Sequence, residues 1–279
     1  MLKEMLEQVR ETVPLIHNIT NYVTVNDCAN ILLACGGSPI MADEPEEVED
    51  IQSICGGLTL NIGTLNTRTV PSMLLAGRRA NKLGHPVILD PVGAGASHLR
   101  TETARKLVQQ IRFAAIRGNI SEIKALVGLD SDTQGVDASV ADAVTEETLD
   151  NILAFVGRLS AQTGAVIAIT GSIDLVADSN RAFVIHNGRR EMGKITGTGC
   201  MLTAMTAAYL TANPNDPLTA TAAAVCAMGV CGEIAFARLQ PGEGNATYRS
   251  RILDAVCHLD GETLEEQARY ELRTIKNQK

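Results

Sequence analysis

Aromatic residues are scarce in this chain of 279 residues, which has four Phe, four Tyr and no Trp. Proteins that bind single-stranded nucleic acids stack the bases on aromatic side chains, so this scarcity argues against such a function. Hydrophobic residues still make up 45% of the sequence, and they are mostly Ala, Val, Ile, Leu and Met. This composition excludes disorder as the main state and is typical of Ala-rich helices packed on β-branched strands.

Positively charged residues are also few. The chain has 24 Lys and Arg against 32 Asp and Glu, which gives a formal net charge of −8. We therefore expect no partnership with nucleic acid or an anionic membrane, and an anionic ligand would need a local site. The N-terminus lacks the basic region and apolar run of a signal peptide. The most apolar stretch, near residues 218–232, is rich in Ala and Thr and short for a bilayer. These features predict a cytoplasmic protein.

Paired cysteine motifs are absent as well. The seven Cys are an odd number without C-x-x-C spacing, and the five His do not lie at ligand spacing from a Cys pair. A disulfide framework and a zinc site are both disfavoured by this arrangement, and reduced cysteines in an intracellular protein are the natural interpretation.

Strand-like and helix-like segments alternate along the chain, and no linker or repeat divides them. Strands are expected at 14–20, in a short segment ending near Met41, and at 57–63, 86–90, 112–119 and 165–171, followed by a hairpin of 173–178 and 181–188. From Gly197 onward the pattern is almost entirely helical. We predict a single α/β domain over 1–279, with a mainly parallel central sheet and helices on both faces. Ligands of such sheets bind at the carboxyl ends of the strands.

The segment from Lys194 to Leu202, KITGTGCML, is a glycine turn that leads directly into an Ala-rich helix. Backbone N–H groups at Gly197, Gly199 and Cys200 could converge on a phosphate there, with the positive end of the helix dipole behind them. The segment is neither a Walker A motif nor a complete G-x-G-x-x-G motif. The residues alone leave an ordinary tight turn and an anion hole equally open.

Polar residues close several predicted strands. Asp90 could hold a metal or oppose a phosphate, although Asp before Pro is also a common turn former. Glu122 has the position of a capping carboxylate paired with Asn119, which we favour over a second acid beside Mg²⁺. Arg117 could bind phosphate oxygens as a fork or form a surface ion pair. Thr170 could belong to a site or merely to the turn after its strand.

Three further side chains fall near the same edge of the predicted sheet. Asn21 follows the first strand, and Met41, at the end of the second, would ordinarily fill the core. His17 is the one histidine within the candidate site, and a hydrogen-bonded structural role is its expected function. A nucleophilic Cys200 would need a histidine base close in space, and the sequence nominates none convincingly.

The sequence resembles the bacterial hydroxyethylthiazole kinase family. The resemblance depends on six segments, in this order and spacing, between about residues 11 and 235: PLIHNITNYVTVNDCANILLACGGSPIMADEPEEVEDI, LNIGT, ILDPVGAGAS, RGNISEI, AITG and ITGTGC. It implies a ribokinase-like fold and an ATP- and Mg²⁺-dependent phosphorylation of 4-methyl-5-(2-hydroxyethyl)thiazole in thiamine salvage. It also implies a homotrimer with active sites at the subunit boundaries. Residues after about 235 match less distinctively.

The resemblance also assigns residues. It places the thiazole against Asn21, Met41 and Gly197, and Mg²⁺ with the phosphates near Asp90 and Glu122. ATP is expected at Arg117, Asn119 and Thr170, and the catalytic group is expected to comprise Cys200, Gly197, Gly199 and Arg117. Most ribokinase-like kinases have Asp, in a G-x-G-D motif, where this chain has Cys200.

The thiol at position 200 changes the expected mechanism. An ordinary thiol, with a pKa near ~8.5, is mostly protonated and is a poor base. Phosphoryl transfer depends mainly on positioning and charge neutralisation, so a weak base is tolerable. The hypothesis is that the backbone from Gly197 to Cys200, with Mg²⁺ and Arg117, stabilises the phosphoryl group while Cys200 contributes shape.

Three alternatives remain at the level of the sequence. The first is another ribokinase-like small-alcohol kinase, such as a hydroxymethylpyrimidine kinase. The second is a nucleotide- or thiazole-binding module without turnover, which the missing Asp base suggests. The third is a cysteine acyl-transfer enzyme, which the lack of a credible base disfavours.

Overall fold

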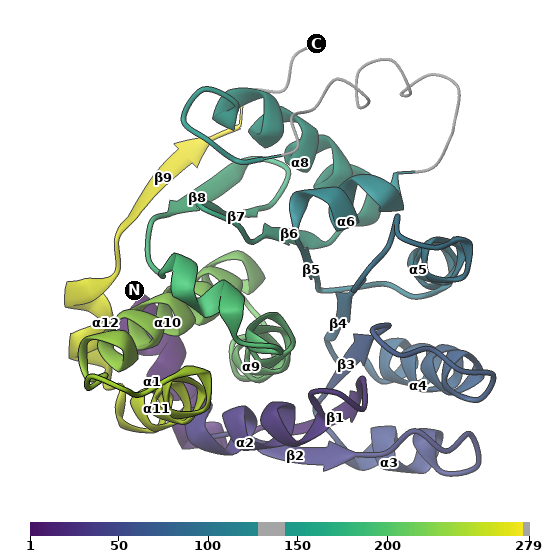
Figure 1. The fold of residues 1–279 in the computed structure, drawn as a ribbon. Helices are drawn as coiled ribbons and strands as arrows, with labels where there is room; N and C mark the ends of the chain where they lie inside the picture. The colour runs from purple at the N-terminus through teal and green to yellow at the C-terminus, as the bar shows by residue number, and fades with distance from the viewer. Residues whose placement is uncertain (128–142, 276–279) are drawn as a thin grey trace.

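A single nine-stranded sheet runs through the computed structural model, which describes residues 1–127 and 143–275 (Figure 1). Its spatial order is β2-β1-β3-β4-β5-β6-β7-β8-β9. The strands are β1 (Leu15–Ile19), β2 (Ser38–Met41), β3 (Gly57–Asn61), β4 (Val87–Asp90), β5 (Ala115–Gly118), β6 (Val166–Ile169), β7 (Asp174–Ala177), β8 (Arg181–Ile185) and β9 (Tyr270–Thr274).

The strands from β1 to β6 pair in parallel, and the three at the other end of the sheet pair antiparallel. The predicted mainly parallel sheet and the predicted hairpin are therefore confirmed. The carboxyl ends of the parallel strands all lie at one edge, where ligands of α/β sheets bind.

Helices cover both faces of the sheet, as predicted (Figure 1). One face carries α1 (Leu2–Thr12), α2 (Val25–Cys35), α9 (Thr198–Ala212), α10 (Pro217–Ala237), α11 (Asn245–His258) and α12 (Gly261–Gln267). The other carries α3 (Val48–Ile54), α4 (Thr69–Leu83), α5 (His98–Gln110), α6 (Ile120–Leu126) and α8 (Leu149–Thr163). A short 3₁₀ helix, η1 (Arg190–Lys194), precedes α9.

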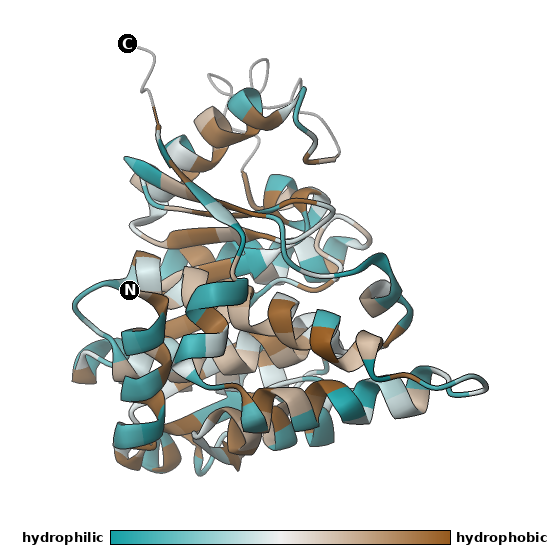
Figure 2. Ribbon diagram, turned by 90° about the vertical axis from the view of Figure 1, so that its left-hand side faces the viewer, coloured by the Kyte–Doolittle hydropathy of each residue, from teal (hydrophilic) through white to brown (hydrophobic). Residues whose placement is uncertain are grey.

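Two hydrophobic clusters form the core, one on each side of the sheet. Successive residues of a strand point to opposite faces, so Ile88 packs with the cluster around α9 and α10 whereas Leu89 packs with the opposite one. All residues of β4 and β6 are buried, because parallel strands are covered on both faces. Figure 2 shows that the helices facing the viewer mix hydrophobic and hydrophilic residues, as expected of helices with one face in the core and one in solvent.

Helix α10 is long and apolar enough to cross a membrane by length and composition alone. In this fold, 78% of its most apolar window is buried inside the protein. It packs against α1, α9 and α11 and contacts β6, β7 and β8. Its hydrophobicity is therefore explained by its place in the core.

The prediction of an almost entirely helical chain after Gly197 is wrong at the C-terminal end. Residues Tyr270–Thr274 form β9, an edge strand antiparallel to β8. The ring of Tyr270 lies 5.3 Å, between centroids, from that of Phe183 on β8. This short, mostly exposed strand is stabilised by backbone pairing with β8 rather than by a periodic apolar pattern of its own, which is why the sequence did not indicate it.

Candidate active site

Side chains from consecutive parallel strands meet at the carboxyl edge of the sheet, and the sequence pattern predicted all of them except Asn61. Each lies at or just after the end of its own strand, and they are Asn21, Met41, Asn61, Asp90, Arg117 and Thr170. The first turn of α9 lies beside them, because α9 contacts β1, β3 and β4. The structure thus brings the glycine turn and the strand ends together.

Asp90 is the buried centre of this edge. Its Oδ2 accepts hydrogen bonds from Asn61 Nδ2 and Thr203 Oγ1, both at 2.9 Å. Its Oδ1 has no hydrogen-bond partner among the described residues and lies 3.7 Å from Arg117 Nη1. Burial raises the pKa of Asp90 to about 6, against the opposing effect of the Arg117 charge. One oxygen of this carboxylate is thus fixed, and the other faces Arg117.

Arg117 connects the strand ends to the first turn of α9. Its Nη2 donates a hydrogen bond to Thr170 Oγ1 at 2.6 Å. A Cβ atom at Gly199 would lie 2.5 Å from Arg117 Nη1, so the guanidinium occupies the space that a side chain would fill. A guanidinium at a helix N-terminus provides two positive groups for a phosphate.

The turn before α9 requires glycine at position 197. Gly197 has a φ of 97°, and a Cβ atom there would lie 2.7 Å from Thr24 Cγ2. Within residues 1–127 and 143–275, no side-chain hydrogen bond caps the N-terminus of α9. Its first backbone N–H groups are therefore available to an anion, which supports the anion-hole interpretation over that of an ordinary turn.

The sulfur of Cys200 accepts two amide hydrogen bonds, from Asn21 Nδ2 and Asn61 Nδ2, both at 3.3 Å. Burial raises the pKa of the Cys200 thiol, and the nearby charge of Asp90 raises it further. The thiol therefore stays protonated at neutral pH, in agreement with the interpretation that it is a poor base.

His17 is not a base for Cys200. Its Nδ1 lies 3.1 Å from Gln52 Oε1 and its Nε2 lies 2.9 Å from the Ala42 carbonyl oxygen, so both ring nitrogens are engaged. Burial lowers the pKa of His17, which favours the neutral ring. The predicted structural role of His17 is confirmed.

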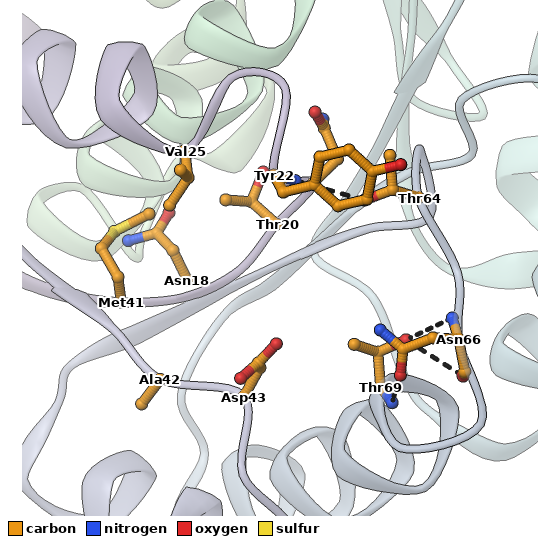
Figure 3. A pocket seen from close by; sticks show the side chains of 11 residues that line it. Asn18, Thr20, Tyr22, Val25, Met41, Ala42, Asp43, Thr64, Asn66 and Thr69 are labelled. Carbon is orange, nitrogen blue, oxygen red and sulfur yellow. Dashed lines mark hydrogen bonds between the residues drawn. The ribbon is translucent and has the colours of Figure 1, made fainter.

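A small pocket of about 190 Å³ lies at the ends of β1 and β2 (Figure 3). In Figure 3, Asn18, Met41 and Val25 gather on one side of it and Asn66 and Thr69 on the other. Asn21 and Met41, both predicted to bind the thiazole, line it together. Its lining residues are Asn18, Thr20, Asn21, Tyr22, Val25, Met41, Ala42, Asp43, Thr64, Asn66 and Thr69.

A larger cavity of about 550 Å³ lies at the ends of β5 and β6 and is also lined by Thr198 and Gly199 of the first turn of α9. Its lining includes the polar residues Arg117 and Thr170 and the apolar residues Met192, Val225 and Met228. This volume falls within the ~300–1,000 Å³ typical of ligand pockets. A lining that combines a guanidinium for phosphates with apolar side chains for a base suits a nucleotide.

The structure does not bring every predicted residue into these two spaces. Gly197 and Cys200 line neither, although Cys200 contacts Asn21 of the small pocket. Asn119 and Glu122 form a capping box at the start of α6, as we favoured. The Glu122 oxygens accept from Gly93 N and Asn119 N, both at 2.9 Å. Contacts of Asn119 and Glu122 with ATP or metal remain predictions.

Sequence reasoning missed three residues of the site. Asn61 and Thr203 hold Asp90, and Asp174 lines the larger cavity, where Gly171 N donates to its Oδ1 at 2.8 Å. Desolvation by burial raises the pKa of Asp174 to about 7. Asn61 could have been found, since it is a polar residue that closes a strand as Asp90 does. Asp174 gave no such signal, because it begins a strand.

Comparison with solved structures defines the class. A ribokinase-like superfamily protein from Enterococcus faecalis V583 superposes with a TM-score of 0.64 at 13% identity, covering 95% of each chain. The fold is therefore the ribokinase-like α/β fold, and the candidate site comprises a pocket of about 190 Å³ and a cavity of about 550 Å³.

The chain belongs to the hydroxyethylthiazole kinase family, whose sequence model matches residues 6–262. It is 63% identical over 271 residues to the hydroxyethylthiazole kinase of Clostridium acetobutylicum, covering 97% of this chain and 99% of that one. The solved structure of a hydroxyethylthiazole kinase protein from Pyrococcus horikoshii OT3 superposes with a TM-score of 0.83 at 33% identity, covering 99% of both chains. The resemblance stated from the motifs is confirmed.

Proposed function

We propose that the protein transfers the γ-phosphoryl group of ATP to the hydroxyl of 4-methyl-5-(2-hydroxyethyl)thiazole, as a step of thiamine salvage. One observation carries the proposal: Cys200 connects the linings of the small pocket and the larger cavity through one hydrogen bond and one peptide bond. Asn21 lines the small pocket and donates to Cys200 Sγ, while Gly199, one residue earlier, lines the larger cavity. An alcohol and a phosphate bound on the two sides would meet there.

The nucleotide binds in the larger cavity in this proposal. Arg117, which is fixed by Thr170 and rests on Gly199, neutralises phosphate charge together with the free N–H groups of the turn. The apolar side chains of the cavity accept the base. A protein with a net charge of −8 can bind ATP in this way, since the positive potential is local.

Asp90 and Glu122 would hold Mg²⁺ together with the phosphates. The fit depends on the donor set: Asp90 Oδ1 is a buried carboxylate oxygen without a hydrogen-bond partner among the described residues. Mg²⁺ is commonly bound by one or two carboxylates plus substrate phosphates and waters, which suits two acids rather than a complete protein cage. No group of three or more His, Cys, Asp or Glu that could hold a metal occurs in 1–127 and 143–275. When bound, the ion neutralises the charge of the phosphates.

In the transfer, the alcohol oxygen bonds to the γ-phosphorus while the bond from that phosphorus to the β–γ bridging oxygen breaks. ADP leaves with the electron pair, and the hydroxyl proton is released to water. The transition state is loose, so positioning and charge neutralisation contribute most. Cys200, protonated and held by two amides, shapes the turn rather than removing the proton.

We further propose a single domain, because one sheet contains every strand of the described residues.

We propose a homotrimer with active sites at the subunit boundaries. The side chain of Tyr22 supports this assembly, because it lines the small pocket although the residue is 78% exposed in one chain. We propose a cytoplasmic location, which the seven free cysteines support.

The test is ADP formation from ATP and Mg²⁺ with and without hydroxyethylthiazole, with the product identified by mass spectrometry. We expect thiazole-dependent ADP and an equal amount of thiazole phosphate ester, and none without Mg²⁺. Faster phosphorylation of hydroxymethylpyrimidine would favour the alternative kinase. Binding of both ligands without ADP release would indicate a non-catalytic module, the alternative that the protonated Cys200 keeps open.

A further inference from the structure

The side chain of Asn61 connects two parts of the candidate site: the alcohol side, with Asn21 and Cys200, and the phosphate side, with Asp90. The residue ends β3, is 2% exposed, and lines neither the small pocket nor the larger cavity. Its side-chain amide nevertheless reaches both parts. Nδ2 lies 2.9 Å from Asp90 Oδ2 and 3.3 Å from Cys200 Sγ, and Oδ1 accepts from Asn21 Nδ2 at 3.0 Å.

The orientation of this amide is fixed by its neighbours. Gly63 N, a donor, lies 2.9 Å from Oδ1, and Asp90 Oδ2, an acceptor, lies beside Nδ2. Turning the amide over would place N–H groups against N–H groups and an oxygen against a carboxylate oxygen, which is costly in a buried site. The Asn61 side chain therefore has one arrangement, and the groups that it binds are held relative to one another.

We infer that Asn61 is a positioning residue for phosphoryl transfer, which holds Asn21 and Cys200 of the alcohol side in register with Asp90 and Arg117 of the phosphate side. This inference rests on the proposed function. A displacement of about 1 Å between reacting groups can cost on the order of 10²-fold in rate. Loss of Asn61 therefore lowers the rate of transfer more than it weakens nucleotide binding, since Arg117, Thr170 and the turn at Gly199 remain.

Thr203 provides a matched control. Its Oγ1 is the other donor to Asp90 Oδ2, at 2.9 Å, and it has no hydrogen bond to Asn21 or Cys200 among the described residues. Thr203→Val removes one of the two bonds that hold Asp90 and leaves the alcohol side in place. Asn61→Leu, of similar volume, removes both the bond to Asp90 and the connection to Asn21 and Cys200.

The experiment measures kcat and both KM values for wild type, Asn61→Leu and Thr203→Val, with the dissociation constant of ADP by calorimetry and a thermal melt of each. We expect kcat of Asn61→Leu to fall about 100-fold, with the KM for ATP and the ADP affinity within about threefold of wild type. Thr203→Val is expected to lose less than about tenfold. If Asn61→Leu does not fold, Asn61→Ser is measured with the same expected split.

Two results would overturn the inference: a folded Asn61 variant with kcat within threefold of wild type, or an equal loss in Thr203→Val, which would mean that holding Asp90 is sufficient. A wild type that does not phosphorylate hydroxyethylthiazole contradicts the proposed function instead. The ratio between wild type and variants is then measured with the alcohol that the enzyme does phosphorylate.

Discussion

At the scale of single residues, the site has a thiol, Cys200, at the position where the resemblance to ribokinase-like kinases implies a carboxylate base. The Cys200 sulfur is already an acceptor for Asn21 and Asn61, and burial keeps the thiol protonated. A group in this state cannot take the proton of an alcohol. Its contribution must come from its size and from the amides that it holds.

Substitutions of Cys200 distinguish a role of its side chain in shaping the turn from a role as a general base. Cys200→Ala is expected to keep kcat within about tenfold of wild type, because general-base help, typically ~10²–10⁴-fold, is absent already. Cys200→Asp is expected to raise kcat, since a carboxylate there would accept the alcohol proton. Steady-state kinetics of both variants test this. Loss of activity to background in the Ala variant would contradict the view that the thiol is dispensable.

Asp174 makes stability depend on pH. Because burial raises its folded-state pKa to about 7, the folded protein retains a proton that the unfolded chain loses near ~3.8. Stability contributed by this group is present below the unfolded pKa and is lost as pH rises from about 4 to 7, by at most ~1.4 kcal/mol per pH unit. Asp174→Asn should flatten this fall. Urea unfolding across the range measures it, and equal slopes in both proteins would refute the assignment.

The sequence was sufficient to identify residues whose role is indicated by their immediate neighbours in the chain, such as Asp90 after a buried strand and Gly197 in a glycine turn. It could not assign the partners of Asp90, because Thr203 lies 113 positions away and meets it only when α9 packs on the sheet. The capping role of Glu122 was predictable, since Asn119 is three residues distant. Contacts between residues a few positions apart can be predicted from the sequence pattern. Contacts between different helices and strands cannot, because they depend on how those elements pack.

At the scale of elements, the first turn of α9 is the structure on which the proposed phosphate site depends. The helix begins without a side-chain cap, and the guanidinium of Arg117 rests where a Gly199 side chain would be. The sequence indicated this turn through its glycines. It did not indicate that the second glycine makes room for an arginine 82 residues earlier in the chain, because that requires β5 and α9 to be neighbours.

Gly199→Ala tests this element. The new methyl group would displace Arg117, so we expect the KM for ATP to rise, or kcat to fall, by about tenfold or more. Gly193→Ala is the matched control, because Gly193 also lines the larger cavity and nothing lies within 4 Å of an added Cβ. Calorimetric titration with ADP would show the difference. Equal behaviour of the two variants would mean that Arg117 does not depend on the gap at Gly199.

At the scale of the whole molecule, alternation of strands and helices was sufficient to predict the sheet, its layers and its binding edge. The strand that escaped prediction, β9, lies at the far edge of the sheet and takes no part in the site. The low aromatic content now has a sharper meaning. The small pocket has Tyr22 as its sole aromatic lining residue among the described ones, so we expect a thiazole in it to contact mainly Asn21, Met41 and backbone.

Assembly is the prediction that belongs to this scale. Light scattering coupled to size exclusion should give three times the 29.6 kDa of one chain. Because Tyr22 is largely exposed in one chain and lines the small pocket, Tyr22→Arg should weaken the trimer and raise the KM for the thiazole together. A fully active monomer would exclude active sites shared between subunits.

We propose that the ligands of the small pocket and of the larger cavity meet at the first turn of α9. The most direct test is a crystal structure with hydroxyethylthiazole and a non-hydrolysable ATP analogue bound together. We expect the thiazole ring to lie between Asn21 and Met41, and the γ-phosphate to lie against Arg117 and the turn from Gly197 to Cys200. The hydroxyl should face the γ-phosphorus. A thiazole bound elsewhere, or a hydroxyl separated from the γ-phosphate by the Asn61 side chain, would contradict the proposal.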